Sequence, residues 1–189
     1  LKAIKASGYE AGKDVFVCID SASSEFFNEN KYILQGEDKH LNSGEMISYL
    51  KTLTSKYPIN SIEDGLDEDD WEGWKSLTQT LGSEVQLVGD DLFATNSERI
   101  KRGIEESVAN SVLIKMNQIG TISETLEAVA LSQENGYKTI ISHRSGETED
   151  TSIADLAIGL AAGQIKTGAP SRTDRVSKYN RLIILEEKF

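Results

Sequence analysis

The sequence predicts an α/β fold with a parallel sheet, in the form of an incomplete (β/α)8 barrel. Short apolar runs typical of buried strands alternate with segments of helical spacing, which is the pattern of a parallel sheet. A reactive side chain stands at the end of each successive run, at Asp20, Glu63, Asp90, Lys115, His143 and Lys166. A barrel builds its site from the ends of successive strands, whereas an open doubly wound sheet places its site at one switch point. The pattern therefore favours the barrel.

The strands and helices are predicted from the apolar pattern and from the capping residues. The six strands are expected at Asp14–Asp20, Ile59–Asp64, Val85–Asp90, Val112–Lys115, Lys138–Ser142 and Gln164–Thr167. Helices are expected at Ser43–Lys56, Asp67–Leu81, Asn96 or Ser97 to Ser107, Thr121–Gly136, Ser152–Ala162 and Arg172–Glu187. The segment Ser21–Asn42 is polar and irregular, and we interpret it as an excursion at one end of the domain.

A complete barrel has eight strands, and the pattern accounts for six of them. The chain opens on Leu1 rather than Met, and Leu1–Ile4 already has helical spacing before Gly8. We therefore expect a processed or truncated product whose first two barrel strands lie upstream.

Composition excludes several classes of function. Lys and Arg number 20 against 31 Asp and Glu, a net charge of −11, which argues against a nucleic-acid or anionic-membrane binder. No apolar run approaches the length of a membrane span, and no signal-peptide pattern opens the chain. Cys18 is the only cysteine, so no intrachain disulfide can form and a reducing cytoplasm fits. Because Cys18 lies within the apolar run Val15–Ile19, we expect it to be a small core residue.

Three carboxylates follow successive predicted strands. Asp20, Glu63 and Asp90 would converge at the mouth of the barrel, where they repel one another unless a cation lies among them. Ligation by oxygen alone suits Mg²⁺. The alternative is that these residues are solvated loop charges. Asp64 and Asp91 fall on the opposite strand face, where supporting or structural roles are expected.

Cationic residues follow the later strands. Lys115 is either a strand-end lysine that reaches water or a desolvated base. Lys166 is either a strand-end lysine that reaches water or a lysine that stabilises the negative charge on an enolate oxygen. The run from His143 through Arg144 and Ser145 to a glycine can grip a phosphate or carboxylate, although His143 alone could be a hydrogen-bonded loop residue. Together with a metal, these groups suit removal of a proton α to a carboxylate.

Six segments in order along the chain closely resemble the enolases, the glycolytic phosphopyruvate hydratases. The most specific is the run Ser-His-Arg-Ser-Gly-Glu-Thr at 142–148. The others are Asp-Ser-Ala-Ser-Ser-Glu-Phe (20–26), Ser-Ile-Glu-Asp-Gly (61–65), Gly-Asp-Asp-Leu (89–92), Ile-Lys-Met-Asn-Gln-Ile-Gly-Thr (114–121) and Gln-Ile-Lys-Thr-Gly-Ala-Pro (164–170).

The resemblance implies that residues 1–189 are the C-terminal part of the enolase barrel domain, without its N-terminal domain and first two strands. It implies a lyase that dehydrates 2-phosphoglycerate to phosphoenolpyruvate in glycolysis, and the reverse in gluconeogenesis, through an Mg²⁺-stabilised enolate. The matching residues give the following roles: Asp20, Glu63 and Asp90 as Mg²⁺ ligands, Lys115 as base, Arg144 and Ser145 as phosphate ligands, Lys166 as a contact to the substrate carboxylate, and His143 as a further substrate-side residue.

Further expectations follow from the same resemblance. The acid that assists loss of the hydroxyl and a loop serine for a second Mg²⁺ have no counterpart here, so we expect the isolated chain to be inactive. The full-length protein is expected to be a cytoplasmic homo-oligomer, either a dimer or an octamer. Some of the protein is expected on the cell surface or in a secreted pool. A racemase or epimerase of the same superfamily is a weaker alternative. A fragment that binds plasminogen through Phe26–Leu34 without turnover is another, although Lys31 is the only cation in that loop.

Overall fold

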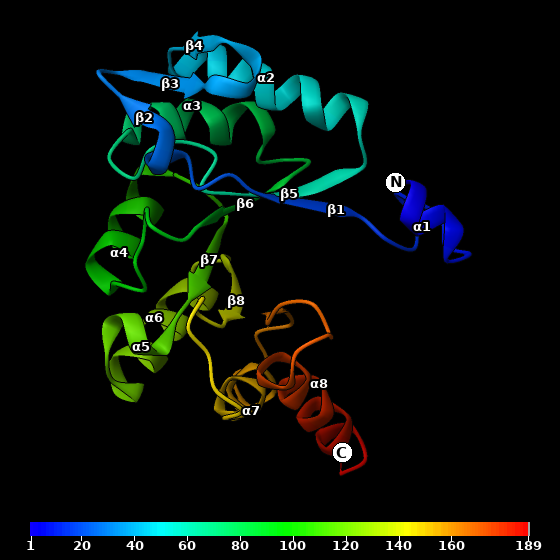
Figure 1. Ribbon diagram of the computed structural model, residues 1–189. Coiled ribbons are helices and arrows are strands. Elements are labelled where there is room, and N and C mark those ends of the chain that lie inside the picture. Colours follow the sequence, from blue (N-terminus) through cyan, green and yellow to red (C-terminus); the bar gives the residue numbers. More distant parts are fainter. Residues whose placement is uncertain (189) are drawn as a thin grey trace. The chain divides into compact units, whose positions relative to one another are not determined.

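The computed structural model describes residues 1–188, which divide into two compact units (Figure 1). Unit 1 comprises Leu1–Leu92 and Arg102–Asn110, and unit 2 comprises Phe93–Lys101 and the described chain from Ser111 onward. The boundary runs through helix α4 (Ser97–Glu106). Each of the six parallel strands that the sequence predicts is present, three in each unit, which confirms the predicted α/β class.

The parallel strands of unit 1 run in the order β1 (Val17–Asp20), β5 (Ile59–Glu63) and β6 (Gln86–Gly89). Helices α2 (Ser43–Lys56) and α3 (Trp71–Leu81) pack against each other, and α2 also contacts β5. The apolar stripe predicted for α3 is buried at Trp71, Trp74, Leu77 and Leu81. A short helix, α1 (Lys2–Ala6), precedes the first strand.

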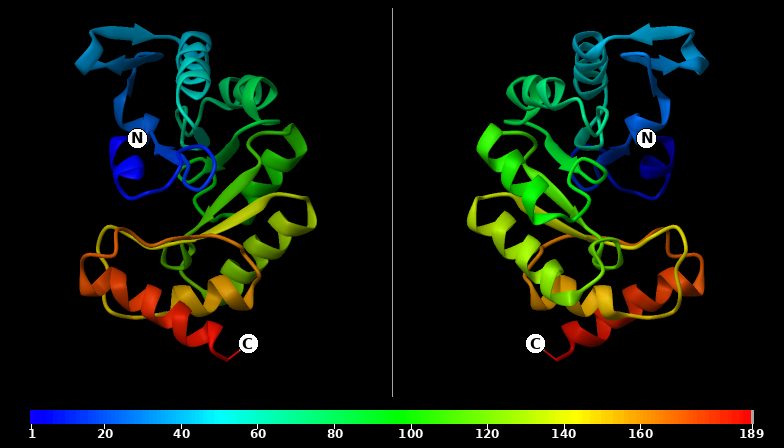
Figure 2. Two further views of the ribbon diagram at one scale, coloured as in Figure 1. Left: turned by 90° about the vertical axis from the view of Figure 1, so that its right-hand side faces the viewer. Right: turned by 90° about the vertical axis from the view of Figure 1, so that its left-hand side faces the viewer.

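Unit 2 repeats the same arrangement with β7 (Ser111–Ile114), β8 (Lys138–Ser142) and β9 (Ile165–Lys166). Every residue of β7 is buried, as expected for a parallel strand that is covered on both faces. Helix α6 (Ile122–Glu134) packs on β7 and β8, and α7 (Ser152–Gly159) packs on β8. Figure 2 shows α7 beside the final helix, α8 (Thr173–Glu186), which it contacts. A one-turn helix that the sequence did not predict, α5 (Met116–Ile119), follows β7.

Side-chain caps fix where several helices begin. The carboxylate of Asp70 accepts a hydrogen bond from the N–H of Gly73 at 3.0 Å, so α3 begins at Trp71 rather than at the predicted Asp67. Asn42 forms a capping box with Glu45 at the start of α2, which begins at Ser43 as predicted. Thr121 caps α6 as predicted, accepting from the N–H of Glu124.

Residues 21–42 are more regular than the sequence indicated. They contain a three-stranded antiparallel sheet of β2 (Phe27–Asn28), β3 (Lys31–Leu34) and β4 (Lys39–Leu41), with 3-10 turns η1 (Ser23–Phe26) and η2 (Gln35–Glu37). The prediction that this segment is irregular was therefore wrong. Strands of two to four residues are too short to show an alternating pattern, and the side chain of Tyr32 alone is fully buried on β3.

The prediction that Cys18 belongs to the core was also wrong. Cys18 is exposed on β1, and its Sγ donates a weak hydrogen bond to Oδ1 of Asn60 at 3.6 Å. The strand itself begins at Val17, not at the predicted Asp14, and exposed residues alternate with half-buried ones along it.

Within the described chain, no helix combines the length and the apolar character that a membrane span needs.

Candidate active site

The three predicted metal ligands lie at or just past the ends of neighbouring strands in unit 1. Asp20 ends β1 and pairs with Glu63, which ends β5, and Glu63 in turn pairs with Val88 on β6. Asp90 follows the end of β6, two residues beyond Val88. Glu63 and Asp90 are buried, with exposed fractions of 7% and 8%, whereas Asp20 is exposed.

Asp64, the next residue after β5, supports the turn that carries Asp90. Its two carboxylate oxygens accept hydrogen bonds from the N–H groups of Asp90 and Asp91 at 2.9 and 2.8 Å. Its backbone is left-handed, with φ of 43°. Burial raises the pKa of Asp64 to about 7. The negative charges of Asp90 and Asp91 also raise this pKa, whereas the hydrogen bonds from the two N–H groups lower it. Asp64 therefore fixes the backbone from which the Asp90 side chain extends.

The acidic groups of unit 1 fit a hard divalent cation. One carboxylate oxygen from each of Asp64, Asp90 and Asp91 lies within 4.8 Å of the other two, which is compatible with a single ion. This group shares Asp90 with the predicted ligand set, and Asp20 and Glu63 lie outside it. An all-oxygen donor set with buried carboxylates suits Mg²⁺, and the choice of Asp20 and Glu63 as ligands stays a prediction.

Lys115 follows β7 in unit 2, where it is half-buried and stands at the N-cap position of α5. Its N–H donates to Oγ1 of Thr95 at 2.9 Å, and the Thr95 hydroxyl donates to the carbonyl of Leu113. Thr95 is itself fully buried and left-handed, with φ of 54°. The start of the Lys115 side chain is thus anchored to a constrained loop, a contact that the sequence did not predict.

The strand register of unit 2 places Lys115 and Lys166 at one level. Ile114 pairs with Ile141, so Lys115 is level with Ser142, and Ser142 pairs with Lys166. Both lysine side chains therefore point to the same face of this sheet. Lys166 is also half-buried, and its carbonyl accepts a hydrogen bond from the N–H of His143 at 2.9 Å.

The predicted anion-binding residues form a turn after β8. The Arg144 guanidinium donates to Oδ1 of Asn117 at 3.3 Å, while Ser145 is exposed. Burial, helped by the positive charges of Arg175 and Lys166, lowers the pKa of His143 below its usual range. The imidazole of His143 is therefore neutral at pH 7, and its Nδ1 is buried with no hydrogen bond to any residue of the described chain.

The family model described as enolase, C-terminal TIM barrel domain, matches residues 1–189. The chain belongs to this enolase family. The match confirms the predicted barrel class, of which the described residues supply six strands. It also identifies a lyase family, and the acidic cluster of unit 1 is compatible with the metal that enolases generally use.

Two site-associated residues of this enolase chain escaped sequence reasoning. Arg175 and Lys178 lie on α8 and are buried, with exposed fractions of 8% and 0%. Both reach the turn that carries Arg144 and Ser145. The signal was present, because two basic residues three positions apart on the buried face of a helix need nearby acceptors.

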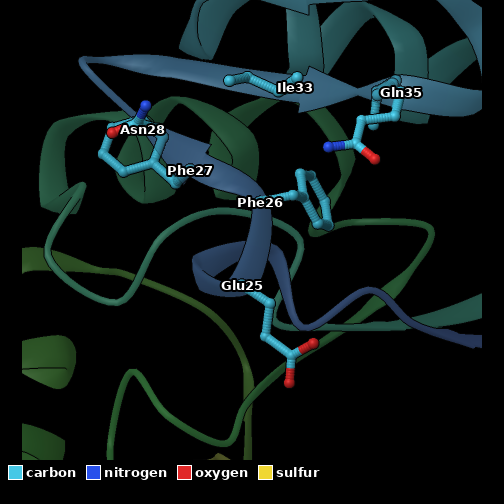
Figure 3. Close-up of a pocket in the computed structure, with 7 residues that line it drawn as sticks. Glu25, Phe26, Phe27, Asn28, Ile33 and Gln35 are labelled. Carbon is cyan, nitrogen blue, oxygen red and sulfur yellow. The ribbon is translucent and has the colours of Figure 1, made fainter.

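A separate pocket of about 560 Å³ lies in unit 1, in the segment that the sequence associates with non-catalytic binding. Figure 3 shows the ring of Phe26 next to the amide of Gln35, while the Glu25 carboxylate points away from them. The remaining lining residues are Phe27, Asn28, Ile33 and Leu34. The lining contains no lysine, and Lys31 stands outside it on β3.

Proposed function

We propose that this chain supplies barrel residues of an enolase that dehydrates 2-phosphoglycerate to phosphoenolpyruvate, and that catalyses the reverse reaction in gluconeogenesis. The observation that carries the proposal is the enolase family match over residues 1–189. The registers of the two units support it, because Asp20 and Glu63 pair at neighbouring strand ends in unit 1 and two lysines share one face in unit 2.

The carboxylates are assigned to magnesium. Asp20, Glu63 and Asp90 would hold the ion, and Asp64 would keep the Asp90 turn in place through its two hydrogen bonds. When bound, Mg²⁺ supplies positive charge that favours the ionised form of the substrate carboxylate and of the enolate.

Lys115 is assigned as the base that takes the C2 proton of 2-phosphoglycerate. Lys115 is half-buried directly after a fully buried strand, and Thr95 fixes its backbone. Lys166, on the same face, would contact the substrate carboxylate and oppose the negative charge that develops as the proton leaves.

The turn after β8 is assigned to the phosphate. Arg144 offers a guanidinium and Ser145 an exposed hydroxyl, the donor types that bind phosphate oxygens. The neutral His143 can accept or donate a hydrogen bond on the substrate side without adding charge.

Partners and setting are also proposals. The acidic balance of the chain fits a cytoplasmic enzyme with no nucleic-acid partner, and the enolase family suggests a homo-oligomer, dimeric or octameric. A second candidate function is a non-catalytic surface, for example for plasminogen, on a cell-surface or secreted pool. The pocket at Phe26 and Ile33 supports it, and the lack of lysine in that pocket weighs against it.

The direct test is phosphoenolpyruvate formation by the full-length protein in the presence of excess Mg²⁺. We expect turnover that a chelator abolishes and that added Mg²⁺ restores. Substitution of Glu63 with Gln should raise the Mg²⁺ concentration needed for half-maximal rate by about tenfold or more. Turnover that survives complete removal of divalent cations, or no dehydration by the folded wild-type protein, would contradict the proposal.

A further inference from the structure

Helix α8 holds the backbone of the turn that carries Arg144 and Ser145. The Arg175 guanidinium donates through Nη1 to the carbonyl of Arg144 at 3.0 Å and through Nη2 to the carbonyl of Ser145 at 3.1 Å. One planar fork therefore spans two successive peptide groups. The Arg175 side chain also lies under Gly168, where an added Cβ would stand 3.0 Å from its Cδ.

A second cation of α8, Lys178, contacts the later residues of the same turn. The Lys178 ammonium donates to the carbonyl of Thr148 and to that of Asp174, and pairs with the carboxylate of Glu147 at 3.1 Å. The Glu147 carboxylate accepts in turn from the N–H of Arg144 at 3.0 Å. Burial alone would raise the pKa of Glu147, but the hydrogen bonds from Arg144 and Lys178 lower it, so the carboxylate is ionised.

These contacts are costly if their purpose is only to attach α8. The Lys178 side chain is 1% exposed and that of Glu147 is 15% exposed, and taking both charges out of water opposes folding. A more exposed ion pair between Asp155 and Arg181 already joins α7 to α8 without touching the turn. The buried pair differs in that one hydrogen bond links it to the backbone of the predicted phosphate ligand Arg144.

We propose that Lys178 and Arg175 are positioning residues that set the conformation of the Arg144–Ser145 turn for binding a phosphate group. Neither side chain would touch the phosphate. Lys178 acts through Glu147 on the start of the turn, and Arg175 acts on its two carbonyls, so that the Arg144 guanidinium and the Ser145 hydroxyl leave the turn in fixed directions. The inference rests on the proposed function only for the identity of the anion.

The test measures the dissociation constant of the full-length protein for inorganic phosphate, together with KM for 2-phosphoglycerate. Lys178→Met removes the charge and keeps most of the unbranched side chain. We expect it to raise both constants by about tenfold or more, while exchange of the substrate C2 proton persists at saturating substrate. Arg181→Gln is the matched control on the same helix, and both constants should stay within about twofold of wild type.

A second variant keeps the inference testable if Lys178→Met fails to fold. The double variant Lys178→Met with Glu147→Gln leaves no unpaired buried charge, and the Gln amide oxygen can still accept from Arg144. A folded double variant with weakened phosphate binding supports a positioning role. Wild-type constants in a folded Lys178→Met or double variant would overturn it, and so would a wild-type protein that does not bind phosphate. Phosphate binding that weakens as expected, in a protein without dehydratase activity, would overturn only the proposed function.

Discussion

A single buried carboxylate at Asp64 holds two backbone N–H groups of the turn that bears Asp90. Its left-handed backbone suits Asp or Asn better than a residue with a nonpolar side chain, because a short polar side chain tolerates that conformation. Hydrogen bonding and backbone preference at this position therefore favour the same residue type.

Asp64→Asn should lower the free energy of unfolding by about 1–3 kcal/mol. The amide nitrogen of Asn cannot accept a hydrogen bond, so one of the two N–H groups that Asp64 holds loses its acceptor. Urea unfolding of the full-length protein without divalent cations measures the change. Asp64→Ala loses both acceptors and adds the left-handed strain, so it should cost about 1 kcal/mol more. Equal stabilities of the Asn and Ala variants would show that the carboxylate does not hold the turn.

The sequence predicted the positions of the reactive residues better than it predicted which other residues contact them. The reactive residues at Glu63, Lys115 and Lys166 stand at or just after their strand ends, because a strand end is a local property of the sequence. The partners of these residues could not be predicted. Thr95 reaches Lys115 from a loop twenty positions away, and Lys178 reaches Glu147 from a later helix.

Among the elements, the antiparallel sheet of unit 1 is joined to α3 through one buried tyrosine. The Tyr32 hydroxyl donates to Oδ2 of Asp70 at 2.8 Å and accepts from the N–H of Asp67 at 3.0 Å. Asp70 also caps α3 and accepts from the hydroxyl of Ser43 at 2.5 Å, at the start of α2. One carboxylate thus fixes the sheet and two helices relative to one another within unit 1.

Tyr32→Phe should destabilise the protein by about 1.5–3 kcal/mol, since it removes a part-buried hydrogen bond to a carboxylate and takes the acceptor away from the N–H of Asp67. A double-mutant cycle with Asp70→Asn, followed by urea unfolding, should give a coupling energy of about 0.5–3 kcal/mol. Tyr49→Phe is the control, because its hydroxyl donates to Glu37 at the surface, and it should stay within about 0.5 kcal/mol of wild type. Additive effects of Tyr32→Phe and Asp70→Asn would contradict the proposed link.

The length of each element and its dependence on distant contacts explain which elements the sequence predicted. The long helices α2, α3, α6 and α8 were expected because apolar spacing and end signals agree over ten or more residues. The β2–β3–β4 sheet was not, because it depends on Tyr32 meeting Asp70 across 38 positions, and strands that short carry no periodic signal.

For the molecule as a whole, fold class and family were predictable because both rest on order along the chain. Strand ends that recur once per strand–helix unit predict a barrel, and the run Ser142–Thr148 among other segments predicts the enolase family that the family model confirms. The metal ligands are less predictable. The carboxylates that lie close together are those of Asp64, Asp90 and Asp91. Asp64 accepts hydrogen bonds from the N–H groups of Asp90 and Asp91, and these bonds hold the three residues together.

We propose that Lys115 removes the C2 proton of 2-phosphoglycerate, and exchange of that proton with solvent measures this step. The measurement is incorporation of deuterium at C2 by the full-length protein in D₂O with Mg²⁺, for wild type, Lys115→Ala and the exposed-lysine control Lys138→Ala. Wild type and Lys138→Ala should exchange the proton, and folded Lys115→Ala should not, because no other group is assigned to accept it. Exchange by folded Lys115→Ala at the wild-type rate would show that Lys115 is not the base.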